Sequence, residues 1–185
     1  MNPVSAHATT DYPTLSLAER DRRWAAVRQL LADHSLDAIV VFGLGRDATD
    51  AYLTNEAKKA IVVMTRTEDP VMLLGDVPLE RYDAPGQRWE RWADQWRHGD
   101  QLAMLADLLK ERGLDRGTVG IVGLTGRFVG EARGTISYTT WQEVLRSLPK
   151  VNWVDVAAAY EVLALVKSPE EQVLLRKAAS LGEAA

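Results

Sequence analysis

The amino-acid sequence predicts an α/β fold in which helices cover both faces of a mixed sheet of five to six strands. Segments with the apolar spacing of helices alternate with short apolar runs, as expected for such a layered fold. The runs at 38–42, 60–64 and 71–74 have no polar interruption, which is typical of strands buried on both sides. Only residues 65–70 join the second run to the third, too few for a parallel crossover. These two strands are therefore predicted to be antiparallel neighbours.

Three segments are expected along the chain: a flexible polar arm over residues 1–14, one domain over 15–166, and a linker with a helix over 167–185. Ser168 and Glu171 have the spacing of a capping box, with Pro169 at the first helical position, so a helix begins there. Its apolar side chains have no later element to cover, and we expect it to lead into a domain that this sequence does not contain. These side chains are Leu174, Ala178 and Leu181.

The first half of the domain combines one clear helix with two less regular segments. Ser16 and Glu19 form a capping box that starts a predicted helix running to about Ser35. Residues 47–58, between the first two strands, are predicted to be a short helical or irregular piece. Residues 79–98 are rich in Trp, Arg, Glu and Asp, and are predicted to form a loop followed by a short helix.

The second half alternates helix and strand more regularly. Asp100 caps a predicted helix that Gly113 ends, and a fourth strand follows at 119–122. Thr140 and Glu143 form a further capping box, which predicts a helix ended by Pro149. A fifth strand is expected at 151–156 and a helix at 157–166.

The composition is that of an ordinary globular protein. Of the 185 residues, 46% are apolar and 26% are charged, enough for one domain with a sizeable core. The net charge of −4 and the mixing of bases with acids predict no nucleic-acid partner. The absence of cysteine excludes disulfides and thiolate chemistry and, with no signal peptide or membrane-spanning run, favours a cytoplasmic location.

A glycine pattern after the first strand suggests a nucleotide-binding alternative. Residues 43–48 match G-x-G-x-x-A, the turn that holds the pyrophosphate of a dinucleotide, with Glu68 and Asp69 downstream as possible ribose contacts. The segment after Ala48 is a poor helix, and the next two strands form a hairpin rather than a βαβ unit. The glycines more simply turn the chain, and dinucleotide binding remains the weaker reading.

Two clusters are candidates for a rim or an interface. Trp89, Trp92 and Trp96 have helical spacing among charged residues, and such a stripe is most often core or interface, with a substrate-facing rim as the alternative. The second cluster lies between the first two strands, where a solvated connection is the simplest reading. It comprises Tyr52, Asn55, Lys58 and Lys59.

No catalytic constellation is found in the sequence. His7, His34 and His98 are dispersed, and neither an H-E-x-x-H nor an H-x-x-E-H motif is present to bind zinc. There is no G-x-S-x-G elbow and no thiol nucleophile. We therefore assign no catalytic residue, metal ligand or cofactor to this chain.

Several segments together resemble one protein family. They are Glu19-Arg20 with the first helix, 36–41, 51–55, and 154–155 through Lys167-Ser168-Pro169-Glu170-Glu171 to Ala179. The sequence from about Leu15 to Ala179 resembles the N-terminal domain of creatinase, prolidase and Xaa-Pro aminopeptidase. The most specific part is 167–179, which in that family joins the N-terminal domain to the catalytic "pita-bread" domain.

This resemblance implies a ribonuclease-H-like mixed sheet and a non-catalytic role. Family members hydrolyse short proline-containing peptides or small amide-like substrates, most with two divalent metal ions (Mn, Co or Zn) held by a downstream domain. The N-terminal domain is then expected to dimerise, to contact its own C-terminal catalytic domain, and to restrict substrate access. The matching rim would lie at 52–58, with the Trp89 to Trp96 stripe as a possible addition.

Two classes of function remain open at this point. The chain is either the non-catalytic part of a metallohydrolase or a stand-alone binding or regulatory domain of the same fold. The uncovered apolar face of the last helix favours the first, because a self-sufficient domain is expected to bury such a face.

Overall fold

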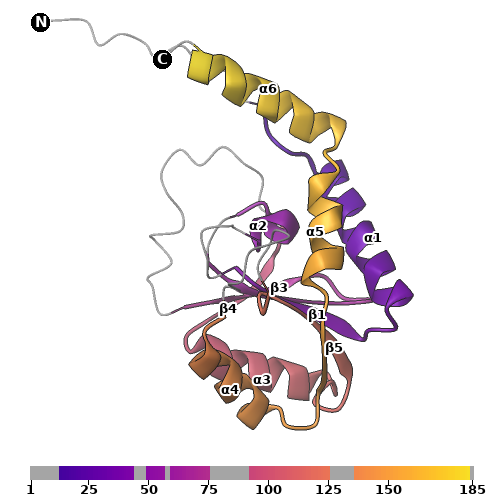
Figure 1. The fold of residues 1–185 in the computed structure, drawn as a ribbon, viewed down its shortest axis with the longest axis vertical. Coiled ribbons are helices and arrows are strands. Elements are labelled where there is room, and N and C mark those ends of the chain that lie inside the picture. Colours follow the sequence, from indigo (N-terminus) through magenta and orange to yellow (C-terminus); the bar gives the residue numbers. More distant parts are fainter. Residues whose placement is uncertain (1–12, 44–48, 57–58, 76–91, 126–135, 184–185) are drawn as a thin grey trace, which may run out of the picture.

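The computed structural model describes residues 13–43, 49–56, 59–75, 92–125 and 136–183. These residues form a three-layered α/β domain with one sheet between two groups of helices (Figure 1). The strands are β1 Ala38–Phe42, β2 Ile61–Thr65, β3 Val71–Leu74, β4 Gln95–His98, β5 Thr118–Val122 and β6 Asn152–Asp155. The helices are α1 Leu17–Asp33, α2 Ala51–Thr54, α3 Gln101–Glu111, α4 Tyr138–Ser147, α5 Ala157–Leu165 and α6 Pro169–Glu183.

The sheet is mixed, in the order β4-β3-β2-β1-β5-β6. β1 pairs with β2 and β2 with β3 in antiparallel fashion, which confirms the predicted hairpin. β1 with β5, β5 with β6, and β3 with β4 are parallel pairs. The predicted mixed sheet with helices on both faces is therefore confirmed.

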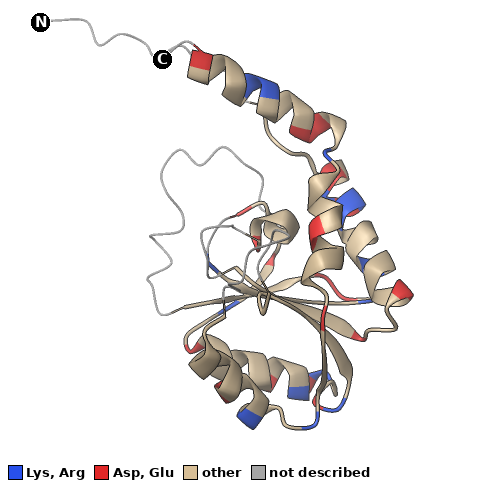
Figure 2. Cartoon of the chain, in the orientation of Figure 1, with Lys and Arg blue, Asp and Glu red and all other residues tan. Residues whose placement is uncertain are grey.

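Alternation of side chains along the central strands produces two cores. Ile39 and Val41 of β1 point toward α1, α2 and α5, whereas Ala38, Val40 and Phe42 point toward α3 and α4. Because each face of β1 is covered by helices, all five of its residues are buried. β1, β2, β3 and β5 contain no charged residue, and the charges of the described chain gather on helices and loops (Figure 2). This burial explains the uninterrupted apolar runs.

Two helix predictions are wrong in detail. Of the loop and short helix predicted over 79–98, residues 79–91 lie outside the described part of the chain. Residues 95–98 form the edge strand β4 rather than a helix, because their backbone pairs in parallel with the apolar strand β3. The helical spacing of the tryptophans therefore has no structural counterpart in this segment. α4 begins at Tyr138, before the predicted cap Thr140, because the Ser137 hydroxyl accepts the hydrogen bond from the Thr140 N–H.

The last helix, α6, projects from the domain beyond α1 and α5 (Figure 1). None of its residues is buried, and Val173, Leu175 and Leu181 are about half exposed. Its predicted capping box is confirmed: the Glu171 N–H donates to Ser168 Oγ at 3.1 Å, and the Ser168 N–H donates to Glu171 Oε2 at 2.8 Å. The start of α6 is thus well defined, while the rest of it has little contact with the domain.

Candidate functional site

The structure separates the residues that the sequence groups as a rim. Lys58 and Trp89 lie outside the described residues. Tyr52 is buried in α2, and Asn55 ends that helix in the left-handed conformation, with φ of 59°. Trp92 is completely buried in the core, whereas Trp96 is 41% exposed on β4. Trp92 and Trp96 therefore do not share a surface.

Tyr52 and Trp92 are brought together by a residue that the sequence analysis did not select, Arg23 of α1. Its guanidinium carbon lies 4.7 Å from the ring centre of Tyr52 and 5.0 Å from that of Trp92. Cation–π contacts of this kind are favourable when the cation is removed from water, and the Arg23 side chain is only 6% exposed. Arg23 thus lies between two of the predicted rim residues.

The polar atoms of Arg23 connect three helices. Its Nε donates to Glu19 Oε1 within α1 at 2.8 Å, and its Nη1 donates to the backbone oxygen of Tyr52 in α2 at 3.2 Å. Its Nη2 lies 3.2 Å from Glu171 Oε1 at the start of α6. A planar guanidinium can make such contacts in several directions at once, which an ammonium group does less well. We call Glu19, Arg22, Arg23 and Glu171 the Arg23 junction.

Glu19 is the buried acid of this junction. Arg22 donates to both of its oxygens at 2.8 Å, in addition to the bond from Arg23. Burial alone would raise the pKa of Glu19, but the hydrogen bonds from Arg22 and Arg23, with their positive charges, outweigh it and lower the pKa to about 2. Glu19 is therefore ionised at neutral pH. It acts as a structural counterion, not as a proton donor.

Tyr52 is likewise fixed by its surroundings. Its hydroxyl donates to the backbone oxygen of Leu163 in α5 at 3.2 Å, and its ring meets that of Tyr160 edge-on at 5.6 Å. Burial raises the pKa of Tyr52, and the nearby arginines oppose this only in part. Tyr52 remains a neutral hydrogen-bond donor that joins α2 to α5.

A second acid of α6 reaches the start of α1. Glu170 accepts hydrogen bonds from both the backbone N–H and the hydroxyl of Ser16, the residue that caps α1. Ser16 in turn accepts the N–H of Glu19, as its capping spacing predicts, but Glu19 does not complete the box because its carboxylate is bonded to Arg22 and Arg23. Glu170 takes its place. The predicted capping box of α1 is therefore half formed.

Gly43, the first residue of the glycine pattern after β1, has a packing role. A Cβ on Gly43 would lie 2.2 Å from Cγ of Asp50, a side chain with no exposed surface. Asp50 Oδ2 accepts the N–H of Ala60, and the Gly43 N–H donates to the oxygen of the same residue. Residues 44–48 lie outside the described part of the chain. The strand that follows, β2, is antiparallel to β1, so the βαβ context of a dinucleotide site is not formed.

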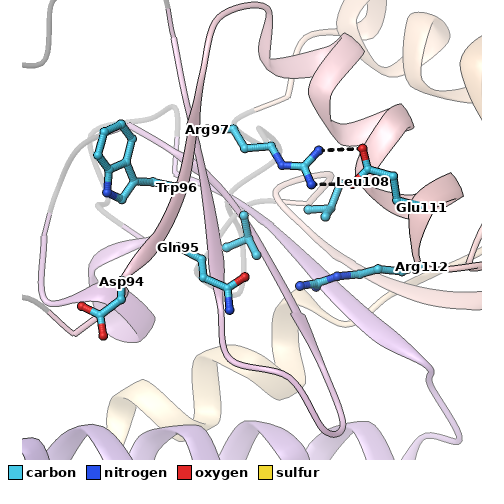
Figure 3. A pocket seen from close by; sticks show the side chains of 8 residues that line it. Asp94, Gln95, Trp96, Arg97, Leu108, Glu111 and Arg112 are labelled. Atoms are coloured by element: carbon cyan, nitrogen blue, oxygen red, sulfur yellow. Dashed lines mark hydrogen bonds and ion pairs between the residues drawn. The ribbon is translucent and has the colours of Figure 1, made fainter.

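Two adjoining hollows lie beside α3, the larger against β3 and β4 and the smaller against the β2–β3 connection. The larger, of about 610 Å³, is lined by Gln95 and Arg97 of β4 and by Glu111 and Arg112 of α3, with Arg97 ion-paired to Glu111 (Figure 3). The smaller, of about 350 Å³, shares Glu111 and Arg112 and includes Glu68, which is paired to Arg112 Nε at 2.7 Å. Four of the charged side chains that line the hollows therefore form two ion pairs, Arg97 with Glu111 and Arg112 with Glu68.

Within the described ranges, no three His, Asp or Glu side chains lie close enough together to hold a metal ion. None of the helices in the described part of the chain is both long and apolar enough to cross a membrane.

Comparison with known proteins agrees with this fold. The family model of the Creatinase/Prolidase N-terminal domain matches residues 23–166. A comparison of the sequence with curated proteins finds no match.

Solved structures of several peptidases are similar to the chain. One is an Xaa-Pro aminopeptidase from Streptococcus pyogenes, with TM-score 0.56, 16% identity, and coverage of 79% of this chain and 99% of that one. Another is the N-terminal domain of the cytoplasmic peptidase PepQ from Mycobacterium tuberculosis H37Rv, with TM-score 0.55, 16% identity, and coverage of 77% and 98%. A third is an Xaa-Pro dipeptidase from Bacillus anthracis, with TM-score 0.60 and 14% identity, where the match covers 85% of this chain but 39% of the longer protein. At these identities the similarity shows the fold.

Proposed function

Since this chain belongs to the creatinase/prolidase N-terminal domain family, we propose that it is the non-catalytic N-terminal domain of an Xaa-Pro peptidase-like or creatinase-like metallohydrolase. In this role it mediates dimerisation and restricts substrate access. The partners are its own C-terminal catalytic domain and a second copy. The substrates are short proline-containing peptides or small amide-like compounds, and the catalytic domain supplies two divalent ions (Mn, Co or Zn). The proposed location is the cytoplasm.

The observation that carries this proposal is a contrast within α6. The first turn of this helix is tied to α1 through Glu170 and Glu171, so its direction relative to the domain is defined. The remainder exposes apolar side chains, including Val173, Leu175 and Leu181. An exposed apolar surface on a well-positioned helix is typical of an interaction site. We therefore assign α6 to contact with a catalytic domain.

The access-restricting rim that we propose comprises residues of α2 and of the tryptophan stripe. Tyr52 and Asn55 belong to α2 and its end, and Lys58 follows them in the sequence. Trp92 supports this region from the core, through its contact with Arg23, whereas Trp96 is exposed at the sheet edge. Trp89 completes the proposed set from the sequence pattern.

Two measurements on the native and purified protein test the proposal. An immunoblot of the source cells with an antibody against this domain is expected to detect a polypeptide well above 20.5 kDa, the mass of this chain. The purified chain is expected to show no hydrolysis of Xaa-Pro dipeptides with Mn, Co or Zn. A native band at 20.5 kDa would instead favour a stand-alone binding or regulatory domain, and metal-dependent turnover by the chain alone would overturn the non-catalytic role.

A further inference from the structure

The outermost strand β4 presents one edge that no other strand in the described part of the chain covers. The N–H of Gly99 donates to the Leu74 oxygen of β3 at 3.1 Å. Alternate residues of a strand direct their backbone groups to the same side, so Arg97 and Gln95 also face β3. Trp96 therefore directs its N–H and C=O outward. Such an edge is a template for pairing with another strand.

The side chains of β4 differ between its two faces. Trp96 lies on the face of α1, since its partner Met72 belongs to that core, and it is 41% exposed. Gln95 and Arg97 lie on the face of α3, where Arg97 is bonded to Glu111 (Figure 3). Asp94, immediately before the strand, extends to the same side as Trp96 in this view (Figure 3). A large, partly exposed aromatic side chain thus lies at an open strand edge.

This short sequence is complementary to itself in one antiparallel register. If two copies pair about a two-fold axis through Trp96, each Trp96 lies opposite its equivalent, Gln95 lies opposite Arg97, and Asp94 lies opposite His98. A cross-strand aromatic pair, such as Trp96 with its equivalent, stabilises antiparallel strands by about 0.2–1 kcal/mol. An axis through Arg97 would instead place two arginines opposite each other, which is unfavourable. The sequence therefore favours the register centred on Trp96.

We propose that β4 is the surface through which two copies of this chain associate, so that their sheets join edge to edge around Trp96. This inference rests on the dimerisation included in the proposed function and names the surface that carries it. A two-fold interface uses the same patch on both copies, as this register does. Because the strand has only four residues, the buried area is small, and a dissociation constant in the micromolar range is expected, on the order of 1–100 μM.

Disulfide trapping tests the register directly, because the chain contains no cysteine. Residues in a hydrogen-bonded antiparallel pair have Cα atoms about 5.5 Å apart, within the roughly 4.4–6.8 Å that a disulfide spans. Trp96→Cys is expected to form a covalent dimer under mild oxidation. The matched control is Asn152→Cys, which places the same thiol at an exposed position of β6, the strand at the opposite edge. Cross-linking of Asn152→Cys without cross-linking of Trp96→Cys would overturn the inference.

Sedimentation equilibrium separates this inference from the proposed function. Wild-type protein is expected to dimerise, Trp96→Lys to weaken the dimer at least tenfold, and Trp96→Phe and Asn152→Lys to stay within about threefold of wild type. Circular dichroism should show native folding in each variant, since Trp96 is outside the core. A wild-type dimer that Trp96→Lys leaves intact would refute the β4 surface while preserving dimerisation. A protein that stays monomeric at all concentrations would refute both the proposed dimerisation and the β4 surface.

Discussion

Glu170 accepts two hydrogen bonds from Ser16, one from its backbone N–H at 2.8 Å and one from its hydroxyl at 2.7 Å. Ser16 caps α1 and Glu170 lies in the first turn of α6, so one carboxylate lies at the start of two helices. Helix N-termini carry partial positive charge, and two of them close together would repel without an acid between them. Glu170 therefore stabilises both helix starts and fixes how α6 leaves the domain.

Replacing Glu170 by alanine is expected to loosen the attachment of α6 to α1, which the Glu171 contact with Arg23 still holds in part, while leaving the domain folded. The change removes a cap of α1, so the free energy of unfolding should fall by about 1 kcal/mol. Hydrogen exchange should accelerate in the first turns of α1 and α6 and remain slow in the central strands. Glu183→Ala, in the last turn of α6, is the control. Unchanged exchange at the start of α6 would contradict the role of Glu170.

Replacing Arg23 by methionine is expected to lower the free energy of unfolding much more than Glu170→Ala does. The variant leaves Glu19 buried without one of its two arginines, and breaking a buried ion pair typically costs about 3–5 kcal/mol. The measurement is urea unfolding, with Arg28→Met as the control. The Arg28 to Asp69 pair lies at the surface, where such pairs contribute less than about 1 kcal/mol.

The double variant Glu19→Gln with Arg23→Met separates the contribution of the ion pair to stability from that of side-chain packing. Removing the buried charge together with its partner should recover part of the lost stability. If Arg23→Met and Arg28→Met lower the free energy of unfolding by equal amounts, the Arg23 junction does not hold the helices together.

The stability of the domain is expected to fall as the pH falls from about 5 toward 2. Glu19 has a folded-state pKa of about 2, below its ordinary value of 4.5, so the folded state favours the ionised form. This contribution is fully present above pH 4.5 and is lost as the pH approaches 2. Urea midpoints of the wild type and Glu19→Gln should therefore differ at pH 7 and converge toward pH 2. A difference that is independent of pH would exclude Glu19 as the titrating group.

Replacing Gly43 by alanine is expected to destabilise the chain by about 1–3 kcal/mol, the usual cost of overpacking. The added methyl would lie 2.2 Å from the buried Asp50 side chain and would displace its bond to Ala60. Gly182→Ala is the matched control, because its methyl meets nothing within 4 Å. Thermal unfolding should show a lower midpoint for Gly43→Ala and an unchanged or slightly higher one for Gly182→Ala. Equal midpoints would contradict the packing role of Gly43.

Several elements could be predicted because their signals are local. The apolar run at β1 requires burial on both faces, and the short connection from β2 to β3 requires a hairpin, so both follow from a few adjacent residues. The capping box of Ser168 and Glu171 is equally local, and both of its hydrogen bonds are formed. In each case the groups that interact lie close together in the sequence.

By itself, the sequence determined the class of fold, the hairpin and the starts of α1, α3 and α6. Only the tertiary structure decided that residues 95–98 are a strand, because pairing with β3 overrides their helical spacing. It also decided which acid completes the cap of Ser16, since Glu19 is drawn to two arginines and the distant Glu170 replaces it. A sequence pattern shows that a polar group needs a partner. Which group supplies it depends on how remote segments meet in space.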